Sequence, residues 1–254
     1  MISIIFCSID PGKAQRTAHH YHMLCGTEPH EVIQINNPRS LADGYNRGIE
    51  ASAGDIVIFS HDDIEFLEPA TWLGRLRAHL DQFDLVGLAG TTRLTGPDWA
   101  RAGPPYTFGQ VAEPGGDIAP YRVLICAVPG PLISGMQALD GLFLAVRRRV
   151  LQQVQFDAST FDGFHVYDID FSFSVHLAGF GVAVAADLPV LHQSQGSFDE
   201  KWRHYAQRFL QKHGARLATF PQRRYRHAMV AAQTREELIE ILNGPRAQWP
   251  SRSG

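Results

Sequence analysis

The chain has 254 residues, of which 44% are hydrophobic and 19% charged, so it has enough apolar material to bury the core of a globular protein. Its formal net charge of -3 provides no excess of lysine and arginine, which argues against a general nucleic-acid-binding protein. Three widely spaced cysteines without a CxxC pair disfavour both a disulfide framework and a thiolate zinc site.

The first ninety residues alternate between apolar runs and helical patterns. The apolar runs cover residues 2–9, 31–35, 56–60 and 85–89, and the helical patterns cover residues 13–25, 41–52 and 71–83. A serine that can cap the second helix precedes it, and a glycine follows its end. Strands that alternate with helices predict βαβ units in a parallel sheet, and therefore an α/β fold.

The segment from Gly90 to Gly135 lacks this order. It contains fifteen glycine or proline residues and a single strand-like run, over residues 121–128. A long irregular segment within a compact domain is usually a functional loop. We therefore expect a loop or lid over the functional site here.

Regular patterns resume after residue 138. Strand-like runs cover residues 139–146, 182–185 and 189–192, and a helix is expected to end at Ala178. Residues 198–212 carry aromatic side chains at helical spacing, which predicts a helix packed on the core by its aromatic face. Thr234 and Glu237 form a capping box that opens a last helix, and residues 245–254 resemble a frayed tail.

Acidic and imidazole side chains occur where the expected strands end. Residues 61–63, with the sequence His-Asp-Asp, follow one apolar run directly, His192 ends another, and Asp168 with Asp170 lies near the start of a helix. Open α/β sheets bind ligands at the carboxyl ends of their strands, so these side chains are candidates for a cation site. An acidic pair can equally begin a turn, and the dipeptide alone favours that reading.

Four motifs that follow one another in order favour the cation site over an ordinary turn. Residues 40–48 are similar to a helix bearing an A-x-N-x-G signature, and residues 61–63 stand at the place of a DXD motif. Residues 139–148 look like an acceptor-side G-x-x-x-A-x-R-R strand, and residues 167–170 look like an E-D-x-D motif. From residue 2 to about residue 212, the sequence resembles GT-A fold glycosyltransferases of the family-2-like group.

The resemblance implies a GT-A fold, which is a Rossmann-like α/β fold with a mixed, mainly parallel sheet flanked by helices. It implies a glycosyltransferase-like domain over residues 1–220, with a donor half of about residues 1–90 and an acceptor half of about residues 121–213. Residues 221–254 are expected to form a helical extension and tail. The implied activity is metal-dependent transfer of a sugar, of the hexosyltransferase type and with inversion. The donor would be a nucleoside-diphosphate sugar, and the acceptor a hydroxyl group of a glycan, a lipid-linked glycan or a small molecule.

The resemblance also assigns roles. The departing diphosphate needs a divalent cation, Mn²⁺ or Mg²⁺, for which Asp63 and His192 are the expected ligands. A nitrogen ligand favours Mn²⁺. Asp168 matches the position of the general base. The residues expected to bind the donor are Ser8, Asn36, Arg47, His61 and Asp62, and those expected on the acceptor side are Trp99, Asp140, Gly141 and Asp170.

Some of these residues have competing interpretations. Arg47 could lie on a solvated or salt-bridged helix face, and Asp170 could cap a helix. Trp99 is the candidate for stacking on a sugar, because nothing in its sequence neighbourhood demands core packing.

Three residues depart from the family pattern. His61 replaces the first aspartate of DXD, Asn36 replaces an aspartate at the end of the second strand, and Tyr167 replaces the glutamate of E-D. These departures leave two alternatives open: a non-catalytic module that binds nucleotide sugars, and a metal-dependent phosphoester hydrolase. Because the chain shows no basic leader and no apolar run of the ~20 residues that cross a bilayer, we expect a cytoplasmic protein, either free or peripheral to a membrane.

Overall fold

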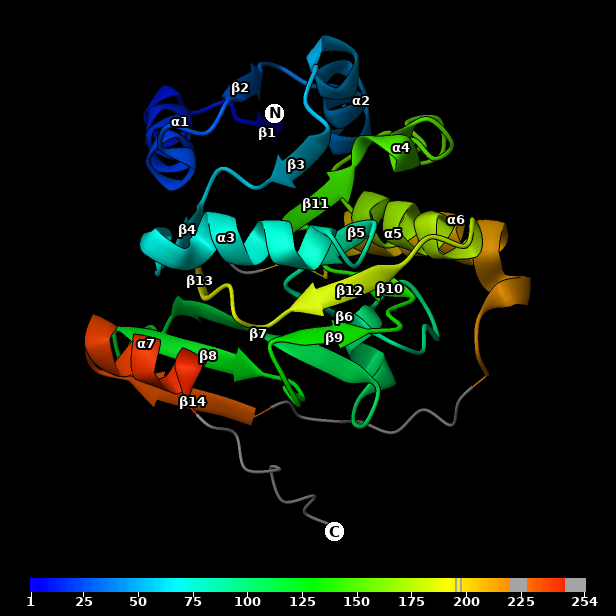
Figure 1. The fold of residues 1–254 in the computed structure, drawn as a ribbon. Coiled ribbons are helices and arrows are strands. Elements are labelled where there is room, and N and C mark those ends of the chain that lie inside the picture. Colours follow the sequence, from blue (N-terminus) through cyan, green and yellow to red (C-terminus); the bar gives the residue numbers. More distant parts are fainter. Residues whose placement is uncertain (195, 197, 220–227, 245–254) are drawn as a thin grey trace, which may run out of the picture.

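The computed structural model describes residues 1–194, 196, 198–219 and 228–244. Two β-sheets form its framework (Figure 1). The first sheet has the strand order β2, β1, β3, β11, β5, β12, β9. These strands are β1 (Ile2–Cys7), β2 (His30–Ile35), β3 (Ile56–Ser60), β5 (Leu85–Gly87), β9 (Leu132–Ser134), β11 (Phe143–Arg147) and β12 (Val182–Ala185).

The first sheet is mixed. β1, β2 and β3 run parallel, as do β5 and β12, whereas β11 lies between β3 and β5 and runs antiparallel to both. The chain therefore has the α/β architecture that the alternating patterns predict, with mixed strand directions in its central sheet.

Helices flank this sheet. They are α1 (Pro11–Cys25), α2 (Leu41–Ala51), α3 (Pro69–Leu80), α4 (Arg148–Leu151), α5 (Tyr167–Leu177) and α6 (Glu200–His213), with short 3-10 turns η1 (Trp99–Ala102) and η2 (Gly214–Arg216). The hydroxyl oxygen of Ser40 accepts a hydrogen bond from the backbone of Asp43 and fixes the start of α2. A Cβ at Gly48 would lie 2.3 Å from a side-chain carbon of Ile5, so glycine allows α2 to approach β1 closely.

The second sheet contradicts the expectation of a loop over residues 90–135. Its strand order is β10, β6, β7, β13, β4, with β8 paired to β7 and β14 paired to β8. These strands are β4 (Ile64–Phe66), β6 (Ala89–Thr91), β7 (Thr107–Pro114), β8 (Tyr121–Ile125), β10 (Ala138–Leu139), β13 (Val190–His192) and β14 (Ala228–Ala232). Strands β6, β7 and β8 thus run through the segment, so the expectation of an irregular loop with a single strand-like run was wrong, while closure over a ligand stays a prediction.

Glycine explains part of this error. Gly109 lies inside β7 with a φ of +108°, and a Cβ there would lie 2.2 Å from the carbonyl oxygen of Leu88. The position thus needs glycine because another strand comes too close and because the backbone is left-handed. A residue type that usually indicates a loop here allows close packing between strands.

The C-terminal segment completes the second sheet. β14 pairs antiparallel with β8, and α7 (Arg235–Asn243) follows it. The two elements share a separate apolar cluster with the sheet, formed by Leu67, Ala112, Val123, Leu191, Ala232, Leu238 and Leu242. Figure 1 shows α7 and β14 beside β8, at the end of the molecule opposite α1 and α2. The expected helical extension therefore includes a strand, while the expected tail at residues 245–254 lies outside the described residues.

None of the helices in the described part of the chain is both long and apolar enough to span a membrane.

Candidate active site

A group of possible cation ligands lies where the two sheets meet. His61 follows β3, Asp63 immediately precedes β4, and His192 ends β13. Antiparallel pairing of β13 with β4 places His192 opposite Ile64, next to Asp63. A backbone hydrogen bond of 2.9 Å from the amide of Gln193 to the carbonyl oxygen of Asp63 extends this pairing. Sheet register thus brings together residues 131 positions apart in the chain.

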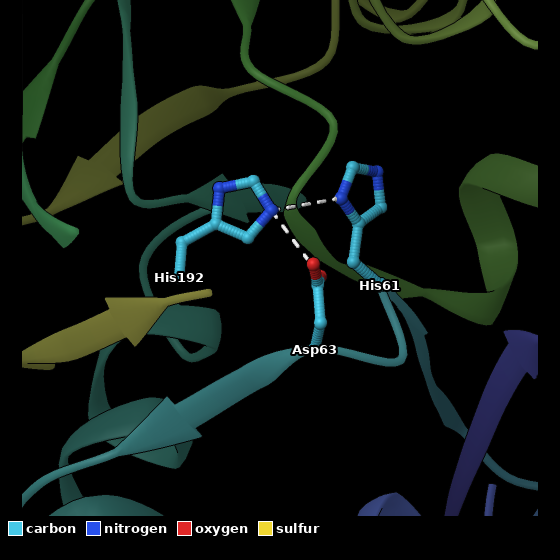
Figure 2. Close-up of side chains that lie close together, drawn as sticks. All are labelled: His61, Asp63 and His192. Carbon is cyan, nitrogen blue, oxygen red and sulfur yellow. Dashed lines mark hydrogen bonds and ion pairs between the residues drawn. The ribbon is translucent and has the colours of Figure 1, made fainter. Parts of the chain in front are cut away.

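The three side chains point toward one another (Figure 2). One ligand atom from each of His61, Asp63 and His192 lies within 4.8 Å of the other two. His192 Nε2 is 3.2 Å from Asp63 Oδ1 and 3.4 Å from His61 Nδ1. Two imidazole nitrogens and a carboxylate oxygen at this spacing fit the ligand set of a divalent metal ion.

The charges of this group are linked. Burial opposes ionisation of Asp63, but hydrogen bonds from His192 and Ser194 outweigh it and hold the pKa of the carboxyl well below its usual range. Burial also disfavours the charged form of His192, yet the hydrogen bond to Asp63 prevails and raises the pKa of this imidazole. Burial and the neighbouring His192 lower the pKa of His61. His61 is therefore neutral near pH 7 and has one ring nitrogen free of hydrogen.

Asp62 lies outside this group and faces the end of β1. Its Oδ2 accepts a hydrogen bond of 2.6 Å from the hydroxyl of Ser8, and its carbonyl oxygen accepts one of 2.8 Å from Thr17 in α1. These two bonds direct the carboxylate of Asp62 toward the carboxyl ends of the parallel strands, away from the cation group.

A cavity of about 450 Å³ lies at these strand ends. Its lining residues are Ser8, Ile9, Pro11, Ala14, Gln15, Ala18, Gln34, Asn36 and Asn37. Two of the residues expected to bind the donor, Ser8 and Asn36, thus line one cavity. Arg47 is not among the lining residues, and its guanidinium lies 3.6 Å from the carboxylate of Asp43 on the same helix.

A second acidic group is formed by Asp140 and Asp168. Asp168 lies in the first turn of α5, and its Oδ2 accepts a hydrogen bond of 2.8 Å from the amide of Gly141. Burial, and after it the negative charge of Asp140, raises the pKa of Asp168 to about 7. A Cβ at Gly141 would lie 2.5 Å from that of Asp168, so glycine allows this contact. The amide of His61 donates to the carbonyl oxygen of Leu142 at 3.0 Å, which connects the acidic group to the cation group.

The comparisons with known proteins agree with this geometry. Residues 3–213 match the sequence profile of a family described as "Glycosyltransferase like family", which covers most of the chain. This protein belongs to that family. A search of curated proteins found no match to the sequence.

Solved glycosyltransferases share the fold of this family member. The mannosyltransferase PcManGT from Pyrobaculum calidifontis, solved with GDP-Man and Mn²⁺, is 12% identical with a TM-score of 0.54, and the match covers 87% of this chain. The chain spans 65% of the length of that mannosyltransferase. GalNAc-T7, solved with UDP, GalNAc and Mn²⁺, is 12% identical with a TM-score of 0.50, over 77% of this chain and 44% of its own. These likenesses confirm the GT-A fold.

Trp99 has a different environment from the one its sequence neighbourhood suggests. Its side chain lies in η1, only 8% of the residue is exposed, and its indole N–H donates to Asp140 Oδ2 at 3.0 Å. The expectation that Trp99 has no packing role was therefore wrong, and it is not an exposed platform for a sugar. In this fold, the indole of Trp99 instead holds the carboxylate of Asp140 in place.

Asp170 has partners that neither sequence interpretation foresaw. It is buried, and its Oδ1 lies 2.7 Å from His213 Nε2 and 2.8 Å from Lys212 Nζ. Both partners belong to α6, so Asp170 links α5 to α6. A pattern within residues 167–170 cannot reveal partners more than forty positions away.

Tyr167 is a site residue that the sequence identified only as a departure from the family pattern. Its hydroxyl lies 3.1 Å from His61 Nε2. His61 is itself a departure from that pattern, so two substitutions 106 positions apart meet in one contact. Before the structure, the only signal of this contact was that both residues depart from the family pattern in the same sequence.

Proposed function

We propose that this protein is a metal-dependent glycosyltransferase that transfers a sugar from a nucleoside-diphosphate donor to a hydroxyl acceptor with inversion. The observation that carries the proposal is the position of a buried carboxyl with a raised pKa beside a group of cation ligands, in a GT-A fold. A transferase of this kind needs a cation for the departing diphosphate and a base for the attacking hydroxyl.

On this proposal, Asp63 and His192 hold the divalent cation, Mn²⁺ or Mg²⁺. When bound, the cation neutralises the charge that develops on the departing diphosphate. The cavity lined by Ser8 and Asn36 receives the nucleoside, because hydroxyl and amide groups there can form hydrogen bonds with a base and a ribose. Asp62, fixed by the hydroxyl of Ser8, lies between the cavity and the cation ligands.

Asp168 acts as the general base. In its ionised form it removes the proton of the acceptor hydroxyl as the oxygen attacks the anomeric carbon, and the diphosphate leaves from the opposite face. The amide of Gly141 donates to Asp168 Oδ2 and orients the carboxyl. Burial, and after it the charge of Asp140, keeps the pKa of Asp168 near neutrality, where a general base is most effective.

Binding of the donor can be tested without knowledge of the acceptor. Nucleoside diphosphates and their sugar esters are screened by thermal unfolding, with and without Mn²⁺, because a ligand bound to the native state raises its apparent stability. We expect one nucleotide to raise the melting temperature, and to do so only when the cation is present. Absence of any shift across the panel would contradict the proposal.

Catalysis is tested with Asp168→Asn, which keeps the shape of the side chain and removes its basicity. Transfer should fall by roughly 10²–10⁴-fold, the usual contribution of a positioned base, while donor binding should remain close to that of the parent. Asp162→Asn, at an exposed carboxylate nearby in the sequence, is the control and should transfer normally. The anomeric configuration of the product, measured by NMR, tests inversion.

Two other outcomes would favour the competing functions. Release of phosphate without an acceptor would indicate a hydrolase, and donor binding without turnover in the parent protein would indicate a binding module. Near-normal transfer by Asp168→Asn would show that another residue acts as the base.

A further inference from the structure

A second cavity, of about 530 Å³, lies between the loop that precedes α5 and the first turns of α6. This volume is within the usual range of sites that bind small molecules. The donor cavity and the cation ligands belong to other segments, so the second cavity is a separate feature of the fold. Its lining combines aromatic rings with polar groups, which belong to Phe164, His165, Glu200, Lys201, His204 and Tyr205.

Close packing of the loop on α6 shapes one wall of this cavity. A Cβ at Gly163 would lie 2.4 Å from the hydroxyl oxygen of Tyr205, so a larger residue there would displace the tyrosine. The carbonyl oxygen of Gly163 accepts a hydrogen bond of 3.1 Å from the amide of Leu41, which fixes the loop to the start of α2. The ring centroids of His165 and His204 lie 6.4 and 5.1 Å from that of Tyr205. The wall is therefore built from contacts that exist without a ligand.

Phe164 is the lining residue whose position packing does not explain. It is 53% exposed, whereas Phe161, three positions earlier in the chain, is fully buried. Contact between a large apolar ring and water is unfavourable, and a ligand that covers the ring would remove this contact. Binding sites commonly combine such a ring with a few polar groups that fix the orientation of the ligand. Phe164 is therefore placed to act as a flat surface for a ligand.

The polar groups restrict the class of this ligand. Glu200 and Lys201 carry opposite charges, so together they favour neither an anionic nor a cationic ligand. With His165 and His204 they can donate and accept hydrogen bonds, and an acyl chain that covered them would leave these groups without partners, at a cost in free energy. A neutral sugar offers hydroxyl groups to such side chains and an apolar C–H face to an aromatic ring. The lining therefore fits a neutral saccharide.

The backbone connects this cavity to the proposed general base. Val166 follows His165 and precedes α5 with a φ of +65°, a left-handed conformation that a β-branched residue rarely adopts. Strain of this kind persists only where the surrounding structure holds it, and it is concentrated at functional sites. Asp168 comes three positions after His165, so the backbones of wall and base lie within about 11 Å, a distance that an oligosaccharide can bridge.

We infer that this cavity binds a neutral sugar unit of the acceptor, and that Phe164 is the ring on which this sugar lies. The inference rests on the proposed function, which gives the bound sugar its role as part of an acceptor. It deepens that function by naming the acceptor as a glycan, either free or attached to a carrier. A small acceptor without a sugar would leave the cavity unused.

The test measures binding to the full-length protein without donor or cation. The probes are methyl glycosides of neutral hexoses and N-acetylhexosamines, together with their disaccharides, and saturation-transfer difference NMR detects and titrates those that bind. We expect at least one probe to bind. Its affinity should fall about 10-fold in Phe164→Ala, because the stacked ring and the apolar area that it covers are lost.

Two further variants show whether the ring itself is responsible. Phe164→Tyr keeps an aromatic ring and should bind the probe as the parent protein does. Phe198→Ala is the matched control, because Phe198 is 59% exposed and lies just before α6 but is not a lining residue of the cavity. It should leave the affinity unchanged. Equal affinities in the parent and Phe164→Ala for every probe, or binding of no probe at all, would overturn the inference.

Other probes distinguish the competing ligand classes. A sugar phosphate that bound more tightly than its neutral glycoside, and did so only with Phe164 present, would indicate an anion site. An octyl glycoside that bound more tightly than the methyl glycoside, again only with Phe164 present, would indicate a site for an acyl chain. Either result would overturn the inference of a neutral sugar site.

The inference and the proposed function fail separately. In the transfer reaction, Phe164→Ala should raise the KM for the acceptor about 10-fold and leave kcat and the KM for the donor close to those of the parent. Transfer with an unchanged acceptor KM in this variant would overturn the inference and leave the function intact. Sugar binding that depends on Phe164, in a protein that transfers no sugar, would support the sugar site and overturn the proposed function.

Discussion

Among single residues, Asp168 combines burial with a neighbouring carboxylate, and the two together raise its pKa to about 7. A carboxyl with a raised pKa stays neutral at lower pH, so the base form is scarce there. The ionised form becomes the main one as pH rises through about 7. A carboxyl of the unfolded chain has a pKa of about 4, so the stability that comes from the protonated form is complete below about pH 4 and is lost as pH rises from there through about 7.

The pH dependence of transfer should follow this titration. We expect the turnover rate to rise from pH 6 to pH 8 with a midpoint near the pKa of about 7. Asp140→Asn removes the second-largest cause of the raised pKa and should move the midpoint to lower pH. The measurement is a series of rate profiles at saturating donor and cation. An unchanged midpoint in Asp140→Asn would exclude Asp168 as the group that the profile reports.

Among the elements, α6 is held to α5 by a buried ion cluster. Asp170 is 1% exposed and bonds both His213 and Lys212, while Lys212 also contacts Asp157 at 2.8 Å. On the same helix, Arg208 pairs with Asp162, whose side chain is 59% exposed. One helix therefore offers a buried and an exposed ion pair for comparison.

Removing the buried partner should cost far more stability than removing the exposed one. Asp170→Ala leaves the buried His213 without its partner and should lower the free energy of unfolding by about 3–5 kcal/mol. Asp162→Ala, the matched control, should lower it by less than about 1 kcal/mol because water screens the pair. Urea denaturation of both variants gives the values. Equal losses would show that α6 does not depend on the buried cluster.

For the molecule as a whole, the C-terminal segment packs under a strand that carries a proposed metal ligand. Leu238 of α7 shares an apolar cluster with Leu191 of β13, and the next residue is His192. Gln110 in β7 also donates to the carbonyl oxygens of Ala186 and Leu242, at 2.8 and 2.7 Å. The segment thus supports the sheet on which the site depends.

Loss of this support should affect both stability and metal binding. Leu238→Ala leaves a cavity in the cluster and should lower the free energy of unfolding by about 2–5 kcal/mol. Because β13 then packs less firmly, Mn²⁺ affinity should also fall. Glu240→Ala, on the exposed face of α7, is the control and should change neither quantity. Calorimetry and urea denaturation measure both. Unchanged Mn²⁺ affinity in a destabilised Leu238→Ala would show that the site does not depend on the C-terminal segment.

The sequence by itself determined the elements whose signals are local. The spacing of its apolar residues and the cap at Ser40 predict helix α2. Asp63 was identified as a site residue because it follows an apolar run, and Asp168 because it lies near the start of a helix. These signals span a few residues, since a helix repeats every 3.6 residues and a strand every two. The order of four motifs then predicted the GT-A fold.

Only the tertiary structure decided the features that depend on distant parts of the chain. The second sheet was hidden because Gly109 serves close strand packing rather than a loop, and Trp99 is buried because it packs in the main core, with its indole bonded to Asp140. The contact between His61 and Tyr167 joins residues 106 positions apart. The raised pKa of Asp168 likewise comes from burial and a neighbouring charge, which exist only once the chain has folded, so no local pattern could carry them.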